Sequence, residues 1–252
     1  MPQVSFDELT TQVSFGSHLA SFPTDTVPAL AAHPQQAALI FTAKQRSFDK
    51  PLILMVATVT DIWDYVDGTE AERYQWELIV NQHLPGALTL VLPASDRVPA
   101  IMRSQNRSTI GIRVPNHAIA QAILAQTGAL ATTSANLSGQ PPLQAMTDIE
   151  AQFPTVLTLS PDAIQQIAGM QPPIVSGSPS SSSPSSSSPS SNIPSSGIPS
   201  SSIPSSSIPS SSIPSSNIPS SGIPSTVIRW HGTGWEILRQ GAVDLHSSNY
   251  KD

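Results

Sequence analysis

The stretch ALATTSANLSG, residues 129–139, joins an apolar run to a cluster of short polar side chains that ends on a glycine. The run Ala129–Ala131 predicts the end of a buried strand. The residues after it, from Thr132 to Gly139, predict a loop whose hydroxyl, amide and backbone N–H groups can bind an anion. A plain Ser/Asn turn explains the same residues, so the rest of the chain has to decide between the two interpretations.

Composition excludes several classes of protein. The chain has 252 residues, no cysteine and a formal net charge of −6. Disulfides and thiolate metal sites are therefore excluded, and bulk electrostatic attraction to nucleic acid or to an anionic membrane is not expected. The N-terminus does not resemble a signal peptide, and no stretch approaches the ~20 apolar residues of a membrane span. We expect a soluble, cytoplasmic protein without membrane contact.

A tract rich in serine and proline occupies residues 176–224. A proline recurs at every fifth position from Pro179 to Pro224, and from Ile193 the repeat is Ile-Pro-Ser-Ser-X. This spacing interrupts helices and sheet ladders, so the tract is predicted to be disordered, with some polyproline II character. A hairpin pattern follows it at residues 225–243. The tract is thus expected to be an insertion in one domain formed by residues 1–175 and 225–243, with a flexible tail at 244–252.

The remaining residues alternate between helix and strand patterns, which predicts an α/β domain. Helices are expected at residues 5–15, 35–43, 70–83, 118–128, 147–152 and 161–168. Strands are expected at residues 18–22, 52–56, 88–92, 108–115, 155–159, 225–230 and 235–241, and another is expected to begin at Ile174. The glycine-rich phosphate motifs G-x-x-x-x-G-K-[ST] and G-x-G-x-x-G are absent. The six histidines show no ligand spacing, so no metal site is predicted among them.

Three features of the chain suit an anionic ligand, and each has a structural alternative. The segment Pro23–Pro28 follows a strand and predicts a ligand loop, or else a turn that caps the next helix. Lys44 and Arg46 close a helix, so they either offset its dipole or clamp a phosphate. Arg113 stands in an apolar strand and must be paired or must face a ligand. Hydroxyls and cations recur along the chain, which favours a phosphorylated or carboxylated ligand: Thr24, Thr26, Lys44, Arg46, Thr109, Arg113, Ser134, Asn136, Ser225 and Arg239.

The order of seven motifs resembles the YrdC family of threonylcarbamoyl-adenylate synthases. The motifs are PTDTV (23–27), KxR (44–46) with KPL (50–52), PGALTLVL (85–92), IGIRVPNH (110–117), TSANLSG (133–139), STV (225–227) and ILRQGAV (237–243). The resemblance spans about residues 5–175 and 225–243. It implies a twisted, mixed α/β sheet with flanking helices around a deep cleft, distinct from the Rossmann and P-loop folds.

The resemblance also implies an activity. The family members are nucleotidyltransferases that form threonylcarbamoyl-AMP and pyrophosphate from L-threonine, bicarbonate and ATP, for the threonylcarbamoyladenosine modification of tRNA. Mg²⁺ would accompany the ATP. Matched motif by motif, the ATP-binding residues would be Lys44, Arg46, Thr109, Ser134, Asn136 and Arg239. The threonine-binding residues would be Thr24, Thr132, Arg113 and Ser225. Lys44, Arg46 and Arg113 would be the catalytic cations.

The chain departs from the family at the segment after PTDTV. The family usually continues with Tyr-Gly-Leu, and this chain has Pro28-Ala29-Leu30. Pro142 also stands where a nucleotide-facing serine is common. These changes suggest an alternative, a catalytically weakened paralogue that binds nucleotide or double-stranded RNA. The partners expected under either interpretation are tRNA or double-stranded RNA and the proteins of the tRNA threonylcarbamoyl-transfer machinery.

Overall fold

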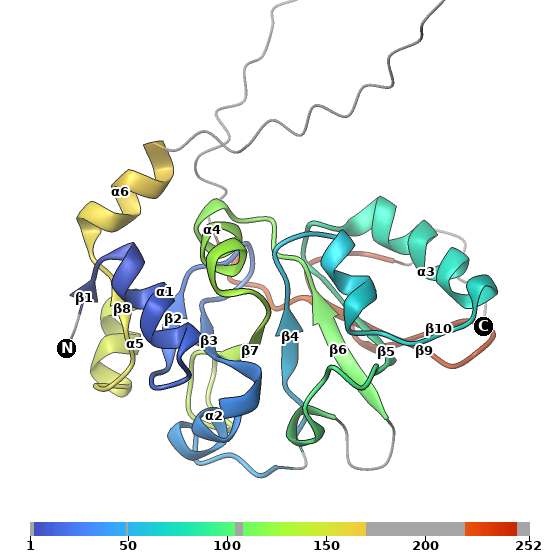
Figure 1. The fold of residues 1–252 in the computed structure, drawn as a ribbon, viewed down its shortest axis with the longest axis horizontal. Coiled ribbons are helices and arrows are strands. Elements are labelled where there is room, and N and C mark those ends of the chain that lie inside the picture. Colours follow the sequence, from blue (N-terminus) through green and yellow to red (C-terminus); the bar gives the residue numbers. More distant parts are fainter. Residues whose placement is uncertain (1–2, 49, 104–107, 170–219, 246–252) are drawn as a thin grey trace, which may run out of the picture. The chain divides into compact units, whose positions relative to one another are not determined.

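The computed structural model describes residues 3–48, 50–103, 108–169 and 220–245, all of which belong to one unit formed by residues 1–171 and 215–252. The fold is mixed α/β with helices packed on a mixed sheet, which confirms the predicted fold class (Figure 1). Residues 176–219 of the Ser/Pro tract, the strand expected from Ile174 and the tail from residue 246 lie outside the described residues.

Helices form where the sequence supplies caps and apolar faces. The N-cap Ser5 accepts a hydrogen bond from the Glu8 amide, and a capping box of Thr69 and Glu72 begins the longest helix. The α-helices are α1 (Phe6–Ser14), α2 (Ala38–Ala43), α3 (Glu70–His83), α4 (Ala118–Thr127), α5 (Met146–Gln152) and α6 (Pro161–Gly169). Three 3₁₀ helices are η1 (Pro34–Gln36), η2 (Thr60–Asp64) and η3 (Ala100–Met102). Within the described ranges, no helix is long and apolar enough to cross a membrane.

The main sheet has eight strands, and Figure 1 shows it from β2 on the left to β10 on the right. In spatial order the strands are β2 (Ala20–Phe22), β3 (Ala29–Ala32), β7 (Leu130–Ser134), β4 (Ile53–Met55), β6 (Thr109–Arg113), β5 (Leu88–Pro93), β9 (Thr226–Trp230) and β10 (Trp235–Arg239). The β4–β6 and β5–β9 pairs are parallel and the others antiparallel. A separate parallel pair joins β1 (Gln3–Val4) to β8 (Thr158–Leu159).

Two strand assignments in the main sheet differ from the sequence-based expectation, and β1 was not predicted either. The segment Ala29–Ala32 forms β3, where no strand was predicted, and Thr132–Ser134 continues β7, where a loop was predicted. The two segments pair with each other, with Ala29 opposite Ser134 and Ala31 opposite Thr132. All four residues of β3, three of them alanine, are buried, and the pairing places Thr133 and Ser134 of TSANLSG in the sheet.

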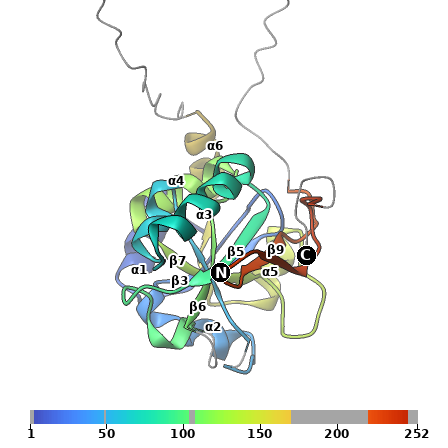
Figure 2. The same ribbon diagram turned by 90° about the vertical axis from the view of Figure 1, so that its right-hand side faces the viewer.

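The two faces of the sheet are covered by different helices (Figures 1 and 2). On one face, α2 and α3 contribute Phe41 and Trp76 to a core with the inward residues of β4, β5 and β6. On the other face, α1, α4 and α6 pack over β2, β3 and the beginning of β7. The rest of this second face, over β5, β6 and β9, lines a cavity.

Candidate functional site

A cavity of about 420 Å³ lies on the second face of the sheet. Side chains alternate between the two faces of a strand, so every second residue of five strands contributes to its floor. On β5, for example, Thr89 lines the cavity while its neighbours Leu88 and Leu90 belong to the core. The floor residues of the five strands are Thr89 and Val91, Thr109, Gly111 and Arg113, Ile53 and Met55, Thr132 and Ser134, and Val227 and Arg229.

The loop Pro23–Pro28, which connects β2 to β3, crosses the face of the sheet and closes one side of the cavity. Its Thr26 Oγ1 accepts a hydrogen bond of 2.7 Å from Arg113 on β6, although β7 and β4 lie between β3 and β6. The buried Thr24 hydroxyl holds the loop in shape, because it donates to the Val27 carbonyl at 2.7 Å and accepts from the Thr26 amide at 3.2 Å. Thr24 therefore supports the wall and does not line the cavity.

Arg113 is paired within the protein and also lines the cavity. Its guanidinium donates to Asp25 Oδ1 at 2.6 Å, to Thr26 Oγ1 at 2.7 Å and to the Gly86 carbonyl at 3.1 Å. Burial lowers the pKa of Arg113, while the charge of Asp25 raises it. A guanidinium has five N–H groups, and within the described residues these hydrogen bonds use three of them.

Arg239 and Ser225 lie beside Arg113. Arg239 donates to the Ser225 carbonyl from Nε at 3.2 Å and from Nη2 at 2.8 Å, and the Ser225 hydroxyl is 2.9 Å from that of Thr89. Within the described part of the chain, no carboxylate lies within 4.0 Å of Arg239. Burial lowers the pKa of Arg239, and its charge in turn contributes to lowering the pKa of Arg113. A bound anion would relieve this repulsion.

Lys44 lies behind the end of β7. Its Nζ donates to the Ser134 carbonyl and, at 3.4 Å, to Asn136 Oδ1, which also accepts a 2.5 Å hydrogen bond from the Ser134 hydroxyl. Lys44 is only 1% exposed, and burial, followed by the charge of Arg46, lowers its pKa to about 7. Neither Lys44 nor Asn136 lines the cavity. Both are hydrogen-bonded to Ser134, which lines the cavity.

Arg46 follows the end of α2 and reaches the cavity at the opposite end of β6 from Arg113. It donates to the Thr133 hydroxyl at 3.0 Å and to the Pro51 carbonyl at 2.8 Å. Thr109 and Ser134 line the same region. Two hydroxyl groups and a guanidinium are suitable donors for phosphate oxygens.

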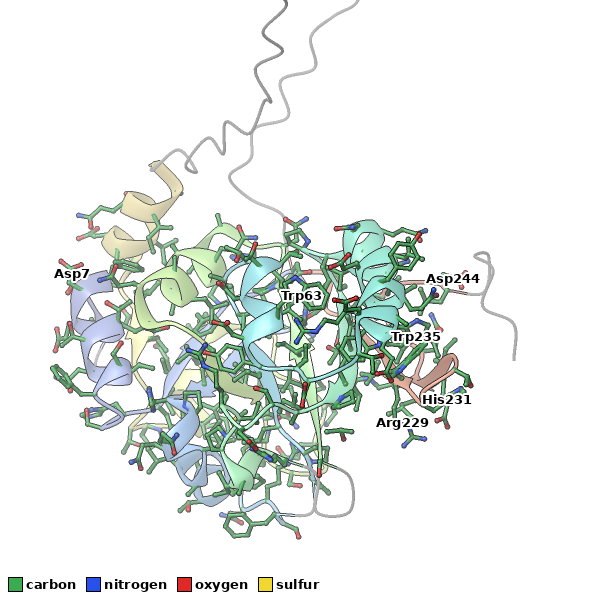
Figure 3. The ribbon with its side chains drawn as sticks, turned by 45° about the vertical axis from the view of Figure 1, so that its right-hand side comes forward. Asp7, Trp63, Arg229, His231, Trp235 and Asp244 are labelled. Atoms are coloured by element: carbon green, nitrogen blue, oxygen red, sulfur yellow. The ribbon has the colours of Figure 1, made fainter. Side chains whose placement is uncertain are left out.

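Of the ten predicted site residues, seven line the cavity and three support it from behind. The seven are Arg46, Thr109, Arg113, Thr132, Ser134, Ser225 and Arg239. Sequence reasoning missed Asp25, Thr89 and Arg229. Thr89 carries a usable signal because it is polar and its neighbours in β5 are apolar, and Arg229 carries one because it is the charged residue of β9. Arg229 is paired with Glu236 across the β9–β10 hairpin, and Figure 3 shows it together with His231 and Trp235.

Among the described residues, the cavity is not lined by a set of metal ligands. Among the residues that the structure describes, no group of three or more His, Asp or Glu side chains could hold one. The described lining residues also include no carboxylate. The expectation that Mg²⁺ accompanies ATP stays a prediction.

The sequence is similar to those of several proteins named threonylcarbamoyl-AMP synthase. A threonylcarbamoyl-AMP synthase from Idiomarina loihiensis is 33% identical over 140 residues, which are 54% of this chain and 74% of that protein. A threonylcarbamoyl-AMP synthase from Vibrio campbellii is 32% identical over 153 residues, 59% of this chain and 81% of the relative. One from Bacillus subtilis is 33% identical over 129 residues, which are 50% of this chain and 36% of that protein.

Solved structures share the fold. Pyrococcus abyssi Sua5, in a structure described as complexed with L-threonine, aligns with a TM-score of 0.64 and 23% identity, over 94% of this chain and 54% of that one. Escherichia coli YciO aligns with a TM-score of 0.65 and 18% identity, over 96% and 91%. The family model Sua5/YciO/YrdC, described as "Telomere recombination", matches residues 16–182. The chain therefore belongs to the Sua5/YciO/YrdC family.

Proposed function

We propose that the chain is an L-threonylcarbamoyladenylate synthase, a nucleotidyltransferase that forms threonylcarbamoyl-AMP and pyrophosphate from L-threonine, bicarbonate and ATP. The observation that carries the proposal is the gathering of seven predicted residues in one cavity. The names of the relatives support the same reaction. Its product would serve the threonylcarbamoyladenosine modification of tRNA, and the proteins of that machinery would be its partners.

The two ends of β6 suggest how the substrates would lie. Thr109 and Arg113 are four residues apart, about 13 Å along a strand. L-threonine would bind near Arg113, with Ser225 and Thr132, and its carboxylate would accept hydrogen bonds from Arg113. ATP would lie toward Arg46, Thr109 and Ser134. Lys44 and Asn136 would act through Ser134, and Thr24 through the loop Pro23–Pro28.

Arg239 would act at the junction of the two substrates. The resemblance assigns it to ATP, yet it lies beside Ser225 and Arg113. In the reaction, an oxygen of the carbamate formed from L-threonine and bicarbonate attacks the α-phosphorus of ATP. The bond between the α-phosphorus and the oxygen that bridges it to the β-phosphorus breaks, and pyrophosphate leaves. A cation at this junction would offset the charge that develops there. Positioning and charge stabilisation suffice for such a step, and no covalent protein nucleophile is required. Mg²⁺ would enter as the Mg·ATP complex.

The test is threonine-dependent release of pyrophosphate from a mixture of Mg·ATP, bicarbonate and L-threonine. The key variant is Arg113→Lys, which keeps the charge but loses the fork of donors. We expect it to raise the KM for threonine at least tenfold. Arg97→Lys is the control, because Arg97 is an exposed arginine paired with Asp64. Unchanged threonine saturation in Arg113→Lys would refute the carboxylate assignment.

One observation favours the alternative of a catalytically weakened paralogue that binds nucleotide or double-stranded RNA. Pro28 and Ala29, which depart from the Tyr-Gly of the family, both line the cavity. Ala29 pairs with Ser134, and the Pro28 carbonyl accepts a hydrogen bond from the Ala135 amide at 3.0 Å, so the departure affects the cavity wall beside Ser134, where ATP would lie. ATP binding without threonine-dependent pyrophosphate would support this alternative, and the fluorescence anisotropy of a labelled RNA duplex would show whether RNA binds. Recovery of turnover in the double variant Pro28→Tyr, Ala29→Gly would identify the cause.

A further inference from the structure

The segment Ser220–Ser225, here called the clasp, is hydrogen-bonded to the loop Pro23–Pro28. The amides of Ser221 and Gly222 donate to the carbonyls of Asp25 and Thr26, at 3.1 and 2.9 Å. The Ser220 hydroxyl donates to the Thr26 carbonyl as well. Residues 220–224 were predicted to be the end of the Ser/Pro tract, so these hydrogen bonds correct that boundary.

The other end of the clasp is fixed by the residues after β10. The Ala242 amide donates to the Pro224 carbonyl at 3.0 Å. A Cβ atom on Gly241 would lie 2.3 Å from the Pro224 carbonyl oxygen and 2.5 Å from the Ser225 carbonyl carbon, so only glycine permits this approach. The clasp is therefore held between the loop and the chain that follows Arg239.

The clasp is linked to the guanidinium groups of both Arg113 and Arg239, to the first through the loop Pro23–Pro28 and to the second directly. Asp25 and Thr26, whose carbonyls accept from the clasp, hold Arg113 through their side chains. The Ser225 carbonyl, at the end of the clasp, accepts two hydrogen bonds from Arg239. Movement of these six residues would therefore displace Arg113 and Arg239 together.

We infer that Gly222 is a positioning residue for this pair of arginines and thereby sets the affinity for the carboxylated substrate. Gly222 has φ +69°, a backbone conformation that residues other than glycine rarely adopt. In this conformation its amide reaches the Thr26 carbonyl. The identity of the substrate as L-threonine rests on the proposed function, whereas the docking of the clasp does not.

The test compares two glycine-to-alanine variants of the full chain. Gly222→Ala strains the backbone in the docked state and brings its Cβ to 3.3 Å from Gln144 Nε2. Gly232→Ala is the matched control, because Gly232 also has a positive φ, of +98°, but lies in the β9–β10 turn with nothing within 4 Å of its Cβ. Left-handed strain of about 1–2 kcal/mol corresponds to a factor of about 5 to 30 in the docking equilibrium.

Two measurements are needed. Hydrogen exchange of the amides at residues 221 and 222 should be about 5 to 30 times faster in Gly222→Ala and unchanged in Gly232→Ala. The KM for L-threonine should rise by a similar factor in Gly222→Ala only, with kcat changing less. Unchanged exchange at 221 and 222, or equal KM values in the two variants, would overturn the inference.

The two proposals fail in different ways. An inactive wild-type chain would refute the proposed function, and the exchange comparison would still decide whether Gly222 holds the clasp. If Gly222→Ala does not fold, Ser220→Ala takes its place, because it removes one hydroxyl donor and leaves the backbone unstrained. Unchanged exchange in that variant would count against the inference.

Discussion

Asp25 and Arg113 form a buried ion pair of 2.6 Å that joins the loop over the cavity to its floor. Their side chains are 7% and 4% exposed, and the residues are 88 positions apart in the chain. The pair fixes the loop to the sheet and leaves the guanidinium facing the cavity. Stability and ligand recognition thus depend on the same side chain.

Substitution of Asp25 by Asn should strongly destabilise the fold. It would leave the Arg113 charge buried without a carboxylate, which costs about 3–5 kcal/mol of the free energy of unfolding. The control is Asp64→Asn, because the Asp64–Arg97 pair is 58% and 63% exposed, and the expected loss there is about 0–1 kcal/mol. Urea denaturation measures both. Equal losses would contradict the buried role of Asp25.

Lys44 should make stability depend on pH. Its pKa is about 7 in the folded chain and about 10.4 when unfolded. Between these values the unfolded state binds the extra proton, so stability rises with pH, by up to about 1.4 kcal/mol per unit. The wild type should therefore gain stability relative to Lys44→Met from pH 7 to pH 9.5.

Denaturation at several pH values would test this expectation, with Lys50→Met as the control because Lys50 is exposed. A stability difference between the wild type and Lys44→Met that stays constant from pH 7 to pH 9.5 would show that Lys44 keeps its proton in the fold.

Gly111→Ala should separate binding from stability. A Cβ on Gly111 would lie 3.5 Å from Thr89 Cγ2 and 3.6 Å from Ile53 Cγ1, which are ordinary contacts, so the melting temperature should change little. The added methyl group would nevertheless occupy the cavity floor and weaken ATP or threonine binding about tenfold. Thermal shift with each ligand would measure the effect, and Gly169→Ala on α6 is the control. Unaltered binding would place the ligands away from Gly111.

Deletion of residues 191–215 should leave the domain stable. The deletion removes five repeats and keeps the sequence SNIPSSGIPS before Thr226, because residues 191–200 and 216–225 are identical. Halving a loop changes its closure free energy by only about 0.6 kcal/mol. Thermal denaturation of the two chains should differ by no more than this. A loss above about 2 kcal/mol would mean that the deleted residues pack against the domain.

Local sequence could predict Arg113 but not its partner. An arginine among apolar residues must be paired or face a ligand, and Arg113 is both paired and placed on a cavity wall. Asp25 was not identified because its loop crosses β7 and β4 to reach Arg113 on β6, and such a crossing is a tertiary feature. For Lys44, the sequence predicts either an interaction with the helix dipole or a contact with a phosphate. Its burial against the Ser134 carbonyl is also a tertiary feature, because it depends on the position of β7 relative to α2.

The strand character of Thr132–Ser134 was missed for a related reason. Three consecutive hydroxyl residues favour a loop when considered alone. They extend a strand here because β3 pairs with them, and because the side chains of Thr132 and Ser134 line the cavity instead of entering the hydrophobic core. Helices with caps and strands with strong apolar runs, such as α3 and β5, were placed correctly because their signals are local.

Along the strands of the cavity floor, successive side chains alternate between the core and the cavity. Correct strand register is therefore needed both for the hydrophobic core and for the binding site. A slip of β5 by one residue would send Leu88 or Leu90 into the cavity and Thr89 into the core, and a slip of β9 would exchange Val227 with Ile228. A misregistered molecule would thus lose its core and its binding surface at once. Conversely, mutations on the cavity side of these strands can change ligand preference over evolution while the hydrophobic side keeps the fold intact.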